Sequence, residues 1–294
     1  MTIQPPNWFD VNAMIDQSVP SPRAKWWRWM AVSMLVGLLF ATLTAGGNPA
    51  AQLALRILTG AVLLAFMAIL VSLAWSANRA ARNERQQIDQ LEEMVTLRQW
   101  PAAAMSLHAL LLRPMLNHGA RIQALMYLSS VLGRYHRFTD ALDVHNYLLN
   151  HFELDGNTVF NIRVGRVMAM LREDHLVDAD RAISELRRMN GATETAAYAL
   201  VQLFRDVKTG HAAEATELFE KRRALFAAQL GHRAADAFLL AAQAYLSRGD
   251  RESAGRCFHD ATLLAPTMEL KRRYPETAAL FEAFEPAAAP LEAR

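Results

Sequence analysis

The stretch from Phe238 to Pro266 limits most strongly what this chain can fold into. It holds two apolar stripes with helical spacing, one on each side of a Gly-Asp turn signal. The stripe residues are Phe238, Ala241, Ala242 and Tyr245 before the turn, and Ala254, Phe258 and Ala261 after it. A helix with one apolar stripe has to bury it against another element. Because Pro266 stops the second stripe, we predict two short helices joined at Gly249 and Asp250.

The same pattern recurs upstream at a nearly constant interval. If Ala254 is taken as the marker, alanines stand at equivalent places 36 to 39 residues apart, at Ala103, Ala141, Ala179 and Ala215. Mostly apolar residues follow each alanine by four positions, namely Leu107, His145, Ile183, Phe219 and Phe258. So regular a period predicts five helical hairpins stacked side by side.

The C-terminal unit resembles a tetratricopeptide repeat. Its glycine turn at Gly249, the alanine at 254, the aromatic residue at 258 and the closing Pro266 all fall at that family's positions. Upstream, the glycine turn recurs only at Gly210. The resemblance implies an all-α fold, a right-handed α-solenoid of helical hairpins, and a scaffold that binds other proteins rather than an enzyme.

Two apolar runs precede the repeats. Residues 26–45 begin with three tryptophans and carry no charge after position 28, and a second run extends from Ile57 to Trp75. Each is close to the length needed to cross a hydrocarbon core of about 30 Å. A Gly-Gly-Asn-Pro turn at 46–49 separates them, so we expect a two-helix transmembrane hairpin over residues 26–76. A cleaved signal peptide at the first run is the alternative.

Flanking cations predict the orientation of this hairpin. Positive charges cluster outside the two runs, at Arg23, Lys25 and Arg28 before the first and at Arg79, Arg82 and Arg85 after the second. The connection between the runs offers only Arg56. Loops rich in Lys and Arg stay on the cytoplasmic side. We therefore expect an integral inner- or plasma-membrane protein with both termini and the repeat domain in the cytoplasm.

Small residues recur along both apolar runs. They are Ser33, Gly37, Ala41 and Ala45 in the first run, and Ala61, Ala65, Ala68 and Ser72 in the second. Small side chains let helices approach closely in lipid. These stripes either pack on each other within the hairpin or bind a second membrane protein or a second copy.

The apolar runs and the repeats divide the chain into four parts. Residues 1–25 form a polar tail, weakly ordered or lying on the membrane surface, and residues 286–294 form a disordered tail. No Gly or Pro occurs from Ala61 to Trp100, so the second span should continue without a break into the cytoplasmic repeats, residues 77–285. A last helix from Met268 to Phe284 should cover the end of the stack.

No catalytic or metal-binding motif stands out. The nine histidines are scattered, and none forms an i, i+4 pair. The single cysteine, Cys257, lies beside Phe258 on a predicted helix and is expected to be a small core residue. A net charge of +2 gives no reason to expect nucleic acid as a partner. We expect no cofactor, no metal and no catalytic residues.

One pattern suggests a binding groove. In the repeat register, Arg134, Arg172 and Lys208 occupy equivalent places late in three successive first helices. The first helices line the concave groove in the family that the chain resembles. Other candidates for this groove are Tyr127, Asn161, Met168, Phe204, Asp236 and Gln243. A row of cations with hydrogen-bonding neighbours suits an acidic peptide segment or a free C-terminus, although cations late in a helix also favour its dipole.

The sequence therefore predicts a membrane-anchored scaffold that binds a partner segment at the cytoplasmic face of a lipid bilayer. The layout resembles that of bacterial two-span membrane proteins with a tetratricopeptide domain, including a type linked to haem biosynthesis; the resemblance covers architecture alone. An obligate accessory subunit, packing its spans against other subunits, is the alternative function. A membrane-associated enzyme is the remaining rival, and it would need a pocket with convergent titratable groups.

Overall fold

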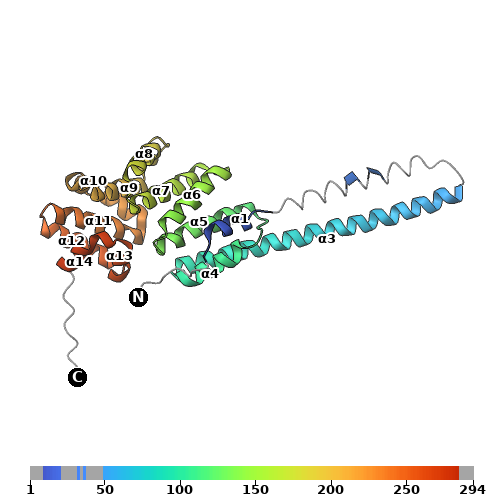
Figure 1. Ribbon diagram of the computed structural model, residues 1–294, viewed down its shortest axis with the longest axis horizontal. Coiled ribbons are helices and arrows are strands. Elements are labelled where there is room, and N and C mark those ends of the chain that lie inside the picture. The colour runs from blue at the N-terminus through green and yellow to red at the C-terminus, as the bar shows by residue number, and fades with distance from the viewer. Residues whose placement is uncertain (1–8, 21–31, 34–35, 38–48, 285–294) are drawn as a thin grey trace, which may run out of the picture. The chain divides into compact units, whose positions relative to one another are not determined.

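The computed structural model describes residues 9–20, 32–33, 36–37 and 49–284, and every regular element in these ranges is helical (Figure 1). The chain divides into two compact units, Met1–Val131 (unit 1) and Leu132–Arg294 (unit 2). The boundary falls inside helix α5, His118–Arg134. The fold is therefore all-α over the described residues.

Helix α3, Pro49–Thr96, is a single helix of 48 residues. Its part from Thr59 onward has a window of mean hydropathy 2.2, none of which is buried. By length and composition it is the one helix among the described residues that is able to cross a membrane. The predicted continuity from the second apolar run into the folded part of the chain is confirmed. The other predicted span, residues 26–45, lies outside the described residues apart from positions 32–33 and 36–37.

The C-terminal part of α3 belongs to the core of unit 1. Helix α4, Trp100–Leu111, packs against it. The two run antiparallel, because Ser106 of α4 contacts Met94 while Arg113, just after α4, donates a hydrogen bond to Gln87. Ile88 and Leu91, three residues apart on this part of α3, are both buried.

The N-terminal segment also packs into unit 1. Helix α1, Val11–Gln17, begins after Asp10, whose carboxylate caps it by accepting a hydrogen bond from the Ala13 amide. Its residues Val11, Met14 and Ile15 are buried, as is Phe9. The expectation of a weakly ordered or membrane-lying tail is wrong for residues 9–20. Their apolar side chains are buried against the rest of unit 1.

Unit 2 consists of helices that pack mainly on their neighbours in the chain. They are α6 (Phe138–His151), α7 (Gly156–Arg172), α8 (Leu176–Arg187), α9 (Ala196–Lys208), α10 (Ala212–Leu230), α11 (Ala234–Ser247), α12 (Arg251–Leu264), α13 (Thr267–Arg273) and α14 (Ala278–Phe284). Three 3₁₀ turns accompany them: η1 (Ala192–Glu194), η2 (Gly231–Arg233) and η3 (Pro275–Thr277). Each helix from α6 to α11 contacts the next one in the chain. In addition, α7 contacts α9, and α9 contacts α11.

Each of the five predicted hairpins turns in the same way. A residue with φ between 57° and 80° stands five positions before each marker alanine: Arg98, His136, Asp174, Gly210 and Gly249. The amide of the following residue donates to the carbonyl five residues back, at 2.8–3.0 Å in all five turns. This is the helix-ending motif that needs a left-handed residue. The sequence showed it only at the two glycines, because Arg, His and Asp take the same conformation in the other three.

The marker alanines are buried near the start of the second helix of each pair. All five, from Ala103 to Ala254, are at most 2% exposed, and each is the fourth residue of the second helix of its pair. A methyl group at this place lets two helix axes approach closely. The predicted register of the repeats is thereby confirmed at every turn.

The C-terminal segment differs from its prediction. Instead of one helix over Met268–Phe284, helix α13 ends at Arg273, and Tyr274 adopts φ −130° and ψ 71° before η3 and α14. Pro275 is the reason, because a residue before proline is disfavoured in the helical conformation. Helix α14 then packs on α11 and α12, with Phe281 against Phe258 at 5.2 Å between ring centroids.

The left-handed turns predict that replacing alanine by glycine has opposite effects on stability at a turn and inside a helix. At Asp174 (φ 57°), a glycine should make the protein about 1 kcal/mol more stable than an alanine, because only glycine adopts this conformation without strain. At Arg181, an exposed position inside α8, glycine should instead be about 1 kcal/mol less stable than alanine. Denaturant unfolding of the four variants measures both differences. The same sign at the two positions would contradict the assigned turn.

Candidate functional site

The candidate groove residues do not all belong to one unit. Tyr127 lies in unit 1, where Gln123 donates a hydrogen bond to its hydroxyl at 3.3 Å. The other eight lie in unit 2: Arg134, Asn161, Met168, Arg172, Phe204, Lys208, Asp236 and Gln243. Of these eight, Asn161 is exposed, whereas Phe204 and Asp236 are buried.

A chain of half-buried ion pairs joins the C-terminal end of α5 and the N-terminal end of α11 to α13. Arg134 at the end of α5 pairs with Glu269 at 2.9 Å. Glu269 also pairs with Arg273, and Arg273 pairs with Asp236 of α11. Positive and negative groups therefore alternate from α5 through α13 to α11, so each charge has an opposite neighbour.

Burial sets the pKa values within this network. Desolvation, followed by repulsion from Arg273, lowers the pKa of Arg134 below its ordinary value. Desolvation opposes the charge of Arg273 as well, but Asp236, Tyr274 and Glu269 outweigh it, and the pKa of Arg273 is raised. Both arginines stay charged, so the network is a permanent set of ion pairs rather than a titrating site.

Arg172 is surrounded by aromatic rings. Its guanidinium carbon lies 4.4 Å from the ring centroid of Tyr274, 5.2 Å from that of Phe204 and 5.4 Å from that of Phe138. It also donates a hydrogen bond to the backbone carbonyl of Arg273. A guanidinium over aromatic faces gains about 2 kcal/mol where water is excluded. These contacts therefore hold the C-terminal end of α13 in place beside α7.

Tyr274 completes this contact and was missed by the sequence analysis. It is 1% exposed and meets Phe204 edge to face, with 5.7 Å between ring centroids. Burial, followed by the negative charge of Asp236, raises the pKa of its hydroxyl. Glu269 and Arg273 were missed as well. All three residues follow Pro266, and the repeat pattern does not extend beyond that residue.

Lys208 is held differently from the two arginines. Its ammonium pairs with Asp174, whose side chain is 71% exposed. An exposed partner contributes little, typically up to about 1 kcal/mol, and competes with water. Of the three predicted groove cations, Lys208 therefore has the partner that is most easily replaced.

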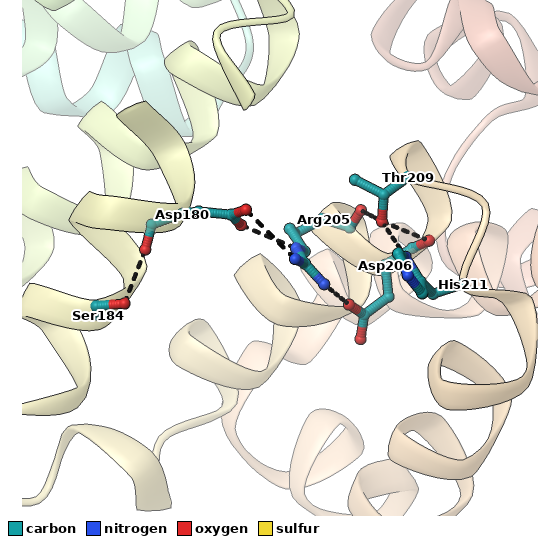
Figure 2. A network of polar contacts seen from close by, with 6 residues as sticks. All are labelled: Asp180, Ser184, Arg205, Asp206, Thr209 and His211. Carbon is teal, nitrogen blue, oxygen red and sulfur yellow. Dashed lines mark hydrogen bonds and ion pairs between the residues drawn. The ribbon is translucent and has the colours of Figure 1, made fainter. Parts of the chain in front are cut away.

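A second polar network joins α8 to α9 (Figure 2). Arg205 binds both carboxylate oxygens of Asp180 at 2.9 and 3.3 Å, and its other terminal nitrogen contacts Asp206 at 3.0 Å. Thr209 and His211 share a 2.6 Å contact close by. The Asp206 carboxylate accepts a hydrogen bond from the Arg205 side chain, and the Thr209 hydroxyl donates one to the Arg205 carbonyl. These contacts stabilise the turn between α9 and α10. It is not arranged as a nucleophile with its base.

The titratable groups that are most buried serve packing. His145 on α6 lies against Gly165 of α7, where an added Cβ would stand 3.0 Å from the imidazole ring. Burial, then the nearby Arg166, lowers its pKa to about 4. Burial also raises the pKa of the Cys257 thiol to about 11, as expected of a core residue.

A shallow cavity of about 190 Å³ lies between α3 and α4 of unit 1. Its lining is mostly amide and apolar side chains: Gln87, Gln90, Leu91, Met94, Ser106, Ala109, Leu110 and Arg113. Over the described ranges no three His, Cys, Asp or Glu side chains gather as a metal site would require.

The predicted transmembrane packing stripe is partly visible. Ala61, Ala65, Ala68 and Ser72 are exposed along α3. Ser33 and Gly37 fall on described residues, whereas Ala41 lies outside them.

Comparisons with protein-family models, with curated proteins and with solved structures gave no significant match.

The buried ion pair supports a double-mutant test. Arg273→Met should lower the free energy of unfolding by about 3 kcal/mol, because it leaves the buried Asp236 carboxylate without its partner. Asp236→Asn should lower it by less, because Arg273 keeps its ion pair with Glu269. The double variant should lose less than the sum, with a coupling of about 1–3 kcal/mol. The matched control is the exposed pair of Glu252 and Arg256, where the same cycle should give at most about 0.5 kcal/mol. Equal coupling in the two cycles would refute the role given to the buried pair.

Proposed function

We propose that this protein is a membrane-anchored scaffold whose stack of helical hairpins holds a partner protein at one face of the bilayer. The observation that carries the proposal is the continuity of α3. The same helix supplies an apolar segment long enough to span lipid and, beyond Glu84, buried residues of the unit 1 core. Such a join holds the folded part at a fixed attitude, which a flexible linker would not do.

The repeating geometry supports a solenoid of the tetratricopeptide type. Five turns share one left-handed position, one hydrogen bond and one buried alanine. Within unit 2, the first helices of successive pairs, α7, α9 and α11, touch in sequence order. Contacts between neighbouring repeats of this kind are what a stacked array requires.

The packing of α1 supports two membrane crossings. Arg121 of α5 donates to the Ser18 hydroxyl at 2.9 Å and to the Ile15 carbonyl at 3.3 Å. The same part of unit 1 is fixed to α3, since Glu84 accepts hydrogen bonds from the amides of Leu116 and Asn117. Residues 18 and 84 therefore lie on one side of a membrane. If α3 crosses between them, the chain has to cross once more, and the apolar run at 26–45 is the segment available.

This topology is tested by cysteine labelling in sealed vesicles, in a Cys257→Ser background. Gln17→Cys and Leu97→Cys should react with a membrane-impermeant maleimide from the same side, and Asn48→Cys from the opposite side. The cations after the span, Arg79, Arg82 and Arg85, favour a cytoplasmic location for the first two under this proposal. Labelling of all three positions from one side would refute the two-span proposal.

The proposed partner is an acidic protein segment. The arginines of the groove register already hold a carboxylate and an aromatic ring of the chain's own α13 segment. Lys208 differs, because its exposed partner Asp174 yields readily to another carboxylate. We therefore place the partner's acidic group at Lys208, with exposed Asn161 farther along the same register.

Site-specific photo-cross-linking in native membranes tests this partner site. A photoreactive residue at Asn161 should capture a protein in fixed stoichiometry, whereas one at exposed Val177 on α8 should not. Lys208→Glu should reduce the Asn161 adduct at least about ten-fold, since it replaces attraction by repulsion. Arg181→Glu is the charge-matched control and should leave the adduct unchanged. An adduct insensitive to Lys208→Glu would refute the groove site.

A further inference from the structure

The membrane-proximal rim of unit 1 combines exposed apolar side chains with unpaired cations. Glu84 lies five residues after Arg79, the first charge beyond the apolar part of α3, which corresponds to a rise of about 8 Å. That distance matches the headgroup layer of one leaflet, about 5–8 Å. Whatever is fixed to Glu84 therefore lies at the outer edge of the headgroups when α3 spans the bilayer.

Glu84 fixes the loop between α4 and α5 at this height. Its two carboxylate oxygens accept hydrogen bonds from the amides of Leu116 and Asn117 at 2.9 and 2.7 Å. Because α4 runs antiparallel to α3, its end and this loop form the rim of unit 1 that faces back along α3 toward the apolar segment. Leu112 and Leu116 on the loop are 37% and 52% exposed.

The N-terminal segment adds a third apolar side chain to this rim. The Met115 amide of the loop donates to the Ser18 carbonyl at 3.1 Å, which holds the end of α1 beside the loop. The next residue, Val19, is 43% exposed. Three exposed aliphatic side chains thus come from two segments that are hydrogen-bonded to each other.

Cations occupy the other side of α3 at the same height. Arg79, Arg82 and Arg85 recur every third residue and are exposed. Glu84 and Ile88, which are buried, project from the side of the helix opposite Arg79 and Arg82, and Arg85 lies between the two sides. Among the described residues no carboxylate pairs with any of these three arginines. The one acidic group of this region that is packed, Glu84, is already engaged by two amides.

We propose that these six residues, Val19, Leu112, Leu116, Arg79, Arg82 and Arg85, form a collar that docks on an anionic lipid leaflet. The arginines bind headgroup phosphates, and the aliphatic side chains enter the headgroup layer from its outer edge. In a bilayer of given thickness, docking would favour one tilt of α3, because the collar contacts the leaflet on two sides of the helix. This inference rests on the proposed membrane crossing of α3 and adds the lipid class and the contact surface.

Three leucine positions, each labelled with a polarity-sensitive fluorophore on an introduced cysteine, separate this inference from the proposed function. The protein carries Cys257→Ser and is reconstituted into phosphatidylcholine vesicles, with or without phosphatidylglycerol. Leu70→Cys reports the span, Leu116→Cys the collar and Leu97→Cys the far end of α3. Leu97 is a close match for Leu116 in exposure, at 59% against 52%, but lies about 26 Å above Arg79.

The expected result is quenching of the Leu70 probe by nitroxide lipid in both vesicles. The Leu116 probe should be quenched and blue-shifted when phosphatidylglycerol is present, and the Leu97 probe in neither vesicle. Arg82→Gln with Arg85→Gln should reverse the Leu116 response, each arginine changing the docked-to-undocked ratio about five-fold. The control, Arg181→Gln with Arg256→Gln, removes two exposed arginines of unit 2 and should leave the response unchanged.

Two other outcomes have distinct meanings. A quenched Leu70 probe with a water-exposed Leu116 probe overturns the collar and leaves the membrane anchor intact. A water-exposed Leu70 probe overturns the anchor itself, and the collar with it. Quenching of Leu116 that is equal in both vesicles overturns the assignment of anionic lipid.

Discussion

The constraint on which the rest of the structure depends is the turn that closes each helix pair. An amphipathic helix of a dozen residues is marginal alone, so each first helix needs its partner folded back along the same side. The left-handed residue and its backbone hydrogen bond impose that reversal at Arg98, His136, Asp174, Gly210 and Gly249. The alanine five positions later then sets how closely the two helices approach. Only the turn, its backbone hydrogen bond and one small residue have to recur. Most other side chains are free to vary, which explains why the repeats are so dissimilar in sequence.

The sequence allowed the register of the fold to be predicted, because buried alanines at a fixed interval reflect a packing requirement that few other residues satisfy. The continuity of α3 was predictable for a related reason: no Gly or Pro interrupts it after Ala61. The turns with Arg98, His136 and Asp174 were not predictable, since these residue types seldom adopt positive φ. The docking of α1 also escaped prediction, because Arg121 and Ser18 are 103 positions apart, and no local pattern links them.

In the candidate site, too, positions that depend on nearby residues were predictable, whereas contacts between residues far apart in the sequence were not. The positions of Arg134, Arg172 and Lys208 late in their helices followed from the repeat register. Their partners did not, because Glu269, Arg273 and Tyr274 lie beyond the last repeat, in a segment whose helix α13 ends at Arg273. Two of the three groove cations are thus used to hold the chain's own C-terminal segment. Buried charges of this kind specify one arrangement, since any other leaves a guanidinium or carboxylate without its counterpart.

Because α3 is unbroken, a tilt at one end of the helix displaces its other end. About 30 Å of helix extends from Trp75, at the end of the proposed span, to Thr96. A change of 10° in the inclination of the span, well within what bilayer thickness imposes on single helices, moves the far end sideways by about 5 Å. If α3 spans a bilayer as proposed, thinning or thickening of that bilayer is thereby converted into a lateral displacement of the end of α3 and of helix α4, which packs on it.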